Sequence, residues 1–167
     1  MAPHATHASL ALAEAPAQSP VETGEQLHSR FGILTIQPEH KLEMPKGPFG
    51  FAGYTQFALA DVPNQPASQF CILQSLEDAS VSFIVLPLAA DNAWIDRRDF
   101  ESACAGYCFD PTTSGLLLIT TMRRGADGQI QTTVNLKAPI VFDTAHQLAR
   151  QVVFTDASYT IQHPLDL

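Results

Sequence analysis

The chain has 167 residues, of which 46% are hydrophobic and 16% are charged, so it can bury one sizeable core and is short for two domains. The 17 acidic residues against 9 basic ones give a formal net charge of −8, which disfavours direct binding of RNA or DNA because phosphates are repelled by such a surface. No apolar run approaches the roughly 20 residues of a membrane-spanning helix. We therefore expect a soluble protein without membrane contact.

The N-terminal part, residues 1–28, is predicted to be a disordered tail ahead of one domain at residues 29–167. Up to about residue 24 the sequence is mostly Ala, Pro, Ser, Thr and His without an aromatic residue, and such a composition buries too little apolar surface to offset its ordering entropy. An alternative is a short Ala-rich helix at residues 9–15 that docks on another surface. The apolar run near residue 10 has no preceding Lys or Arg, unlike a signal peptide.

The three cysteines, Cys71, Cys104 and Cys108, indicate a reducing compartment. Three thiols cannot all pair within one chain, and none of them forms a CxxC pair typical of zinc sites. We expect a cytoplasmic protein without a disulfide framework.

The sequence after the tail predicts a mostly β fold. Short segments rich in β-branched and aromatic residues recur, most of them bounded by turn residues, and the Asp-Gly pair at 127–128 predicts a tight hairpin. Phe83 lies in a run that is apolar on both strand faces, which predicts a core position. The pattern favours an antiparallel barrel or sandwich, and we expect a small antiparallel barrel-like domain. The expected strands are residues 31–36, 54–60, 70–74, 81–86, 116–122, 129–136, 139–142, 151–154 and 159–161.

One segment has the spacing of a helix instead. From Phe100 to Tyr107, apolar residues recur at i, i+3, i+4 and i+7, and Asp96 is placed to cap the first turn. We predict one short amphipathic helix. Cys104 and Cys108 are expected on its apolar face as buried thiols, because no His or carboxylate is spaced to complete a metal site.

Sequence motifs of catalysis are missing. The chain has no GxSxG, HExxH, Walker or GxGxxG pattern, and its histidines show no metal-ligand spacing in the part expected to fold. Gly47, Gly50 and Gly53 lie among prolines and phenylalanines, which favours a shaped loop over a phosphate cradle. We expect no catalytic residue, no cofactor and no metal, and the aromatic residues of this loop could form a docking surface.

Two polar segments within apolar surroundings are candidates for partner contacts. Residues 73–78 run from a strand end into a turn with two acidic residues, which is either a solvated turn or a contact surface. Residues 135–140 contain Pro139, which marks an edge strand or a bulge. Lys137 in this segment resists unwanted strand pairing, although a partner could also be met here.

The chain resembles the FliW family of flagellar assembly factors over residues 30–165. Five blocks carry the resemblance through their order and spacing, since each alone is weak. The blocks are RFGI at 30–33, MPKGPFGF at 44–51, LQSL with Asp78 and FIV at 73–85, NLKAPI at 135–140, and QVV with YTIQHPL at 151–165.

The resemblance implies a small, barrel-like cytoplasmic protein without enzymatic activity. Members of this family bind the RNA-binding translational repressor CsrA and hold it off its messages, flagellin mRNA among them, and they also bind newly made flagellin. When secretion drains flagellin from the cell, the freed factor captures CsrA and flagellin synthesis resumes. The acidic charge fits capture of a basic RNA-binding protein. We expect CsrA and flagellin as partners, and a monomer.

Partner contacts are expected on surface loops and at the chain end. An alternative is a small β-barrel enzyme or ligand-binding protein with an internal cavity; an interior filled by Leu, Ile, Val and Phe would count against it. A flagellin chaperone without control of translation is a third possibility. The residues expected to contact partners are Met44, Phe49, Gln74, Glu77, Asp78, Asp91, Trp94, Asn135, Lys137, Pro139, His163 and Pro164.

Overall fold

The computed structural model describes residues 24–166. The predicted disordered tail and its alternative helix at residues 9–15 fall almost entirely outside the described residues. The expected boundary between residues 28 and 29 lies inside a strand, because β1 (Glu25–Ser29) pairs antiparallel with β2 (Gly32–Ile36). The sequence of β1 is mostly polar, so it lacks the apolar pattern by which the other strands were predicted. Its Leu27 packs against the apolar cluster that contains buried residues of β2.

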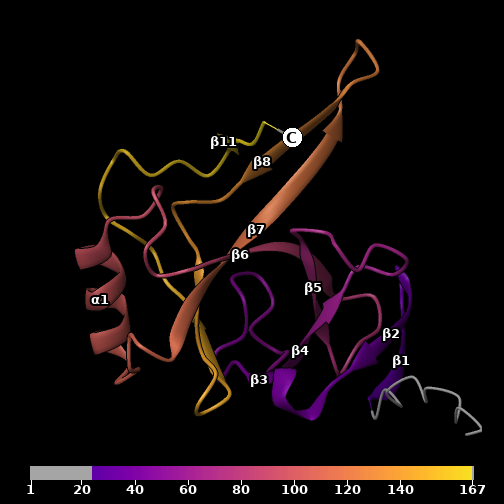
Figure 1. Ribbon diagram of the computed structural model, residues 1–167, viewed down its shortest axis with the longest axis horizontal. Coiled ribbons are helices and arrows are strands. Elements are labelled where there is room, and N and C mark those ends of the chain that lie inside the picture. Colours follow the sequence, from indigo (N-terminus) through magenta and orange to yellow (C-terminus); the bar gives the residue numbers. More distant parts are fainter. Residues whose placement is uncertain (1–23, 167) are drawn as a thin grey trace, which may run out of the picture.

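Seven strands close into a barrel, which confirms the expected mostly β, barrel-like fold (Figure 1). The ring runs β7-β6-β5-β4-β3-β10-β9, and β9 pairs again with β7. All neighbours are antiparallel except β3 and β10, which pair in parallel. The strands of the ring are β3 (Lys41–Glu43), β4 (Gln56–Asp61), β5 (Cys71–Ser75), β6 (Ser82–Leu88), β7 (Ser114–Arg124), β9 (Ile140–Asp143) and β10 (Leu148–Gln151).

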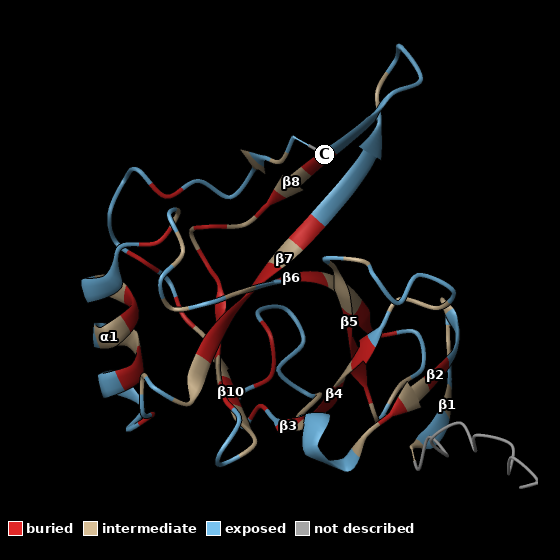
Figure 2. Cartoon of the chain, viewed as in Figure 1, coloured by how far each residue is buried: buried red, intermediate tan, exposed pale blue. Residues whose placement is uncertain are grey.

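Apolar side chains fill the barrel and also cover much of its outside. Along β4, Phe57 belongs to the interior cluster and the next residue, Ala58, to the cluster under β1 and β2. Leu117 of β7 likewise points inward, whereas Leu116 and Leu118 belong to the cluster beneath the helix. Burial on both faces explains why these strands are continuous apolar runs rather than alternating ones, and Figure 2 shows the buried stretches along them. The interior cluster is Leu42, Met44, Phe57, Leu73, Val81, Val85, Leu117, Ile140 and Ala149.

Phe83 does not occupy the core position that we predicted. It is half-buried, packs against the interior cluster, and meets Phe51 edge-on with ring centroids 5.1 Å apart. The run around it is apolar on both faces, so the sequence could not distinguish the covered face from the partly covered one.

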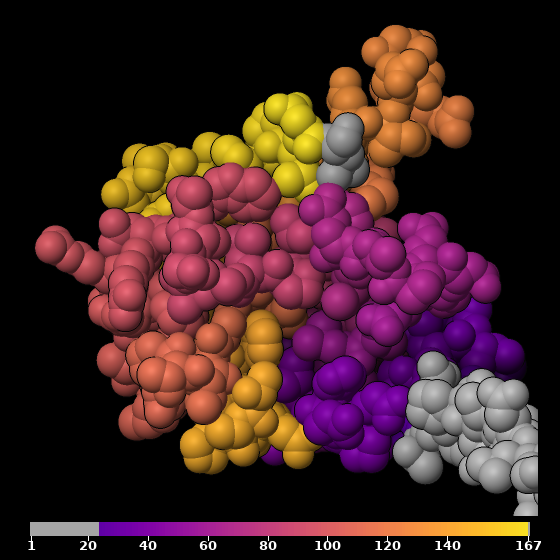
Figure 3. Space-filling view, viewed as in Figure 1, coloured from indigo at the N-terminus to yellow at the C-terminus, as the bar shows by residue number. Residues whose placement is uncertain are grey.

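The predicted helix and hairpin are both present. Helix α1 (Arg97–Gly106) begins after Asp96, whose Oδ1 accepts a hydrogen bond from the Arg98 N–H at 2.8 Å. The Asp-Gly turn joins β7 to β8 (Ile130–Val134), and Gly128 adopts φ +81°. The end of this hairpin stands clear of the rest of the molecule (Figure 3).

Three local expectations are corrected. Cys108 is exposed, unlike buried Cys104, because α1 ends before it and its φ of +59° turns the chain away from the helix. Residues 152–154 lie beyond the end of β10, and residues 159–161 form no strand. The remaining described elements are the short helix η1 (Pro38–His40) and strand β11 (His163–Pro164), which pairs with β8.

Candidate partner-binding groove

Three of the residues expected to contact partners are buried. Met44 and Gln74 have exposed fractions of 1% and 0%, and Pro139 is also buried. The Gln74 side-chain amide donates to the carbonyls of Ser75 and Val81 at 3.0 and 3.2 Å, so it holds the turn after β5 from inside. The expectation of surface contacts is therefore wrong for these three side chains.

Glu77 and Asp78 hold the same turn from outside. Oε2 of Glu77 accepts hydrogen bonds from the backbone N–H groups of Thr55 and Gln56 at 2.6 and 2.9 Å. Asp78 accepts from the Ser80 hydroxyl and N–H, which lowers its pKa, and from the Tyr54 hydroxyl, whose pKa is raised by this bond. Both carboxylates therefore help to hold this turn in shape, so it is more than a solvated turn.

Replacing Glu77 with lysine is therefore expected to lower the free energy of unfolding by about 1 to 2 kcal/mol, because two backbone N–H groups lose a charged acceptor. Urea unfolding measures this difference. The control is Asp91→Lys, since Asp91 is exposed and makes no hydrogen bond among those described, and its effect is expected within about 0.5 kcal/mol. Equal urea midpoints for the Glu77 and Asp91 variants would show that the hydrogen bonds of Glu77 do not stabilise the fold.

The other expected contact residues do not form one patch. Trp94 and His163 come together, with ring centroids 5.5 Å apart, and Pro164 beside them is exposed. Asn135 accepts from the Ala138 N–H at 2.9 Å.

Lys137 also makes contacts within the chain. Its Nζ donates to the Asp156 carbonyl at 2.8 Å, so its side chain is tied to the segment that follows β10. Phe49 alone among the expected residues lines the groove described next.

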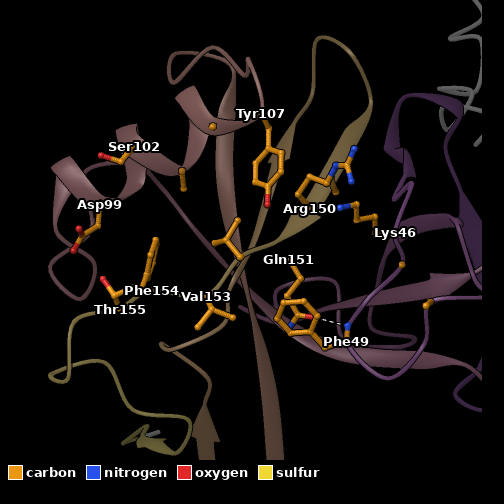
Figure 4. Close-up of a pocket in the computed structure, with 16 residues that line it drawn as sticks. Lys46, Phe49, Asp99, Ser102, Tyr107, Arg150, Gln151, Val153, Phe154 and Thr155 are labelled. Atoms are coloured by element: carbon orange, nitrogen blue, oxygen red, sulfur yellow. Dashed lines mark hydrogen bonds between the residues drawn. The ribbon is translucent and has the colours of Figure 1, made fainter.

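A groove of about 910 Å³ lies between α1, the segment 149–155 and the loop 46–52 (Figure 4). Three apolar side chains along it are open to solvent: Phe49, Tyr107 and Val153 have exposed fractions of 56%, 40% and 57%. Exposed apolar side chains gathered in a concave surface are typical of protein or ligand contacts.

The loop 46–52 has its shape because of a glycine. Gly47 has φ +61°, and a Cβ atom there would lie 2.4 Å from the carbonyl oxygen of Phe51, so a larger residue would force the backbone to move. The Phe49 N–H donates to Oε1 of Gln151 at 2.7 Å, which fastens the loop to β10. Phe49 is thereby held at the rim of the groove.

The charges along the groove are arranged by sign. Lys46 and Arg150 lie at one end, where Arg150 stacks 5.4 Å from the centre of the Tyr107 ring. Among residues 24–166, neither cation forms an ion pair. Asp99 lies at the other end and accepts a 2.6 Å hydrogen bond from Tyr159, whose pKa is raised by burial and by this bond.

Sequence reasoning missed Tyr107, Arg150 and Val153 as surface candidates. Val153 stands between buried Val152 and Phe154, an alternation that shows one exposed side chain within a strand-like run. That pattern could have been found, but nothing in the sequence shows that α1 and the loop 46–52 lie on either side of it.

Comparison with known proteins agrees with this fold. The sequence model of the FliW protein family matches residues 26–165. The flagellar assembly factor FliW of Geobacter sulfurreducens is 31% identical over 140 residues, covering 81% of this chain and 82% of that protein. FliW of Bacillus subtilis is 29% identical over 148 residues, covering 83% of this chain and 95% of that protein.

A crystal structure of a flagellar assembly factor FliW has the same fold. It superposes with a TM-score of 0.61 at 24% identity, covering 86% of this chain and 98% of that chain. Within the described part of the chain, the structure contains no helix with the length and hydropathy of a membrane span. From the family match over most of its length, the chain belongs to the FliW family of flagellar assembly factors.

Proposed function

We propose that this protein binds CsrA and flagellin in the cytoplasm, and that binding relieves repression of flagellin synthesis by CsrA. Its relatives are named flagellar assembly factors, so a role in flagellum biogenesis follows from the family. The observation that best supports action through protein contacts is the groove, because exposed Phe49, Tyr107 and Val153 line a concave surface. Aromatic residues of this kind are enriched among the residues that dominate protein interfaces.

The packing of the barrel bears on the alternative of an enzyme or ligand-binding protein. Its interior cluster consists of apolar side chains with exposed fractions of at most 8%. The titratable side chains of His163 and Asp78 contact different groups, Trp94 and Tyr54. We therefore favour regulation by protein binding without catalysis.

The net charge of −8 supports CsrA as one partner. An RNA-binding protein presents basic residues to phosphates, and an acidic surface attracts the same residues. This attraction is screened by salt, so CsrA binding is expected to weaken as ionic strength rises.

A translation assay tests the proposal. The purified protein is added to a cell-free system in which CsrA represses a reporter behind a flagellin leader. Relief of repression is expected, and added flagellin should reverse it by occupying the protein. The same tagged protein should retain both CsrA and flagellin from an extract of flagellated cells.

The outcomes separate the candidate functions. Retention of flagellin alone, with no effect on the reporter, would support a flagellin chaperone without control of translation. Retention of neither protein would contradict the proposal. A reporter without the CsrA binding site controls for general effects on translation.

A further inference from the structure

The segment that follows β10 is hydrogen-bonded along one edge only. Val152 and Phe154 donate their N–H groups, each at 2.9 Å, to carbonyls of the segment 137–139. The two donors, Val152 and Phe154, are two residues apart, and so are their two acceptors, as in an antiparallel ladder. The N–H and C=O of the residue between them, Val153, therefore point away from the segment 137–139. Within residues 24–166, these two groups of Val153 have no hydrogen-bond partner.

The groove lies on that unpaired side. There β3 pairs with β10 in parallel only at Leu148, and the chain then departs as the loop 46–52. The loop returns to the strand by one hydrogen bond, from Phe49 to the Gln151 side chain. No strand of the described chain continues along Val153, which lines the groove in Figure 4.

The opposite wall of the groove carries small side chains. It is formed by α1, which presents the small residues Ser102, Ala103 and Gly106 to the groove. An added strand needs about 4.8 Å of separation from the edge with which it pairs. Natural proteins usually protect a strand edge with charge, proline or a covering segment, yet here the edge carries exposed Val153.

The charges define the orientation of a segment in the groove. Lys46 and Arg150 favour an acidic side chain near β10, and Asp99 at the other end repels one. A basic protein would meet two cations here, although most of the charge of the chain is negative. The groove is therefore suited to an acidic and apolar segment, whereas the net charge of −8 of the whole chain suits a basic partner.

We propose that an extended segment of a partner protein pairs with residues 151–155 as an added β-strand. Its apolar side chains would pack on Val153 and Phe49, and an acidic side chain would lie between Lys46 and Arg150. This mode of recognition takes affinity from main-chain hydrogen bonds and specificity from alternate side chains. The inference rests on the proposed function in one respect, that flagellin rather than CsrA supplies the segment.

Val153→Pro tests the added strand directly. Proline removes an N–H that has no internal partner, and the ladder made by Val152 and Phe154 is kept. Val153→Thr is the matched control, because it keeps the N–H and the branched shape. We expect flagellin affinity to fall about tenfold in the proline variant and to stay within about threefold in the control. CsrA affinity should be the same in both.

A charge variant tests the same groove independently, in case the proline variant does not fold. Lys46→Glu with Arg150→Glu should weaken flagellin binding and reduce its salt dependence. Arg123→Glu with Arg124→Glu makes the same change of charge on the projecting hairpin, whose four last β7 residues are exposed, and should leave flagellin binding unchanged. Melting curves confirm that all variants are folded.

A peptide separates this inference from the proposed function. Acetyl-Asp-Val-Thr-Val-Thr-Val-amide, titrated to millimolar concentration, should shift the amide resonances of Val153 and Thr155 in wild type. In Val153→Pro, which has no amide proton at residue 153, the Thr155 resonance should not move. Peptide shifts without flagellin binding would contradict the proposed function and leave the strand edge supported. The added strand would be overturned if the peptide causes no shift, or if Val153→Pro and Val153→Thr bind flagellin with equal affinity. If Val153→Pro loses CsrA binding instead of flagellin binding, the assignment of flagellin as the occupant would be overturned.

Discussion

Replacing Phe100 with alanine is expected to lower the free energy of unfolding by about 3 to 5 kcal/mol, because truncation of a buried phenylalanine loses its transfer free energy and leaves a cavity. Phe100 is 1% exposed and belongs to the cluster between α1 and the outside of the barrel. Only Phe100 and Cys104 are buried on α1, so this side chain provides most of the apolar contact of the helix. Urea unfolding followed by circular dichroism measures the loss.

The matched control for this variant is Arg98→Ala on the same helix. Arg98 is exposed, and its truncation is expected to change stability by no more than about 0.5 kcal/mol. Because α1 is one wall of the groove, Phe100→Ala should also weaken flagellin binding while it remains folded. Equal stabilities for the two variants would show that α1 is not anchored through Phe100.

Asp143→Ala is expected to cost about 2 to 4 kcal/mol at neutral pH, since a buried set of donors loses a charged acceptor. Asp143 is 0% exposed at the end of β9. Its carboxylate accepts from the Thr113 hydroxyl at 2.9 Å, the Ala145 N–H at 2.9 Å and Nδ1 of His146 at 2.8 Å. These bonds connect β9 with the start of β7 and with the turn before β10, close to the point where the barrel closes.

The stability due to Asp143 should also depend on pH. Burial acts to raise its pKa, but the hydrogen bonds from His146, Thr113 and Ala145 outweigh burial and hold the pKa below the ordinary value. A carboxyl whose pKa is lower in the folded state stabilises fully above its unfolded pKa of about 3.9 and loses that contribution as pH falls through the folded pKa.

The difference in unfolding free energy between wild type and Asp143→Asn measures this contribution. It should be constant from pH 7 to about 5 and shrink at lower pH. His146→Ala removes one of three donors and should cost less than Asp143→Ala throughout. A difference that grows as the solution is acidified would contradict the direction of the shift.

Local chemistry in the sequence determined several elements. The hairpin follows from Gly128, which adopts the positive φ that its turn requires, and α1 follows from apolar spacing together with the cap at Asp96. Most strands were placed within a few residues, because each is a short apolar run bounded by turn residues. The resemblance of five spaced blocks indicated the family, to which the chain belongs.

The surface could not be predicted in the same way. In the sequence, Gln74 is a polar residue at a strand end and Met44 lies in a loop, but both are buried. The Gln74 amide bonds the turn after β5 from inside, and Met44 packs in the interior cluster of the barrel. Phe83 and Val85 are both apolar residues of β6, yet only Val85 is fully covered. Whether such a residue is covered depends on neighbours that are distant in the chain.

The sequence by itself therefore determined the type of most elements, the helix, the hairpin and the family. Only the tertiary structure decided how the barrel closes, through β7 with β9 and β3 with β10, and where the groove lies. The physical reason is the distance along the chain over which each effect acts: propensity, capping and turn chemistry act over a few residues. The groove instead brings together Phe49, Tyr107 and Val153, whose packing depends on long-range contacts that no local pattern records.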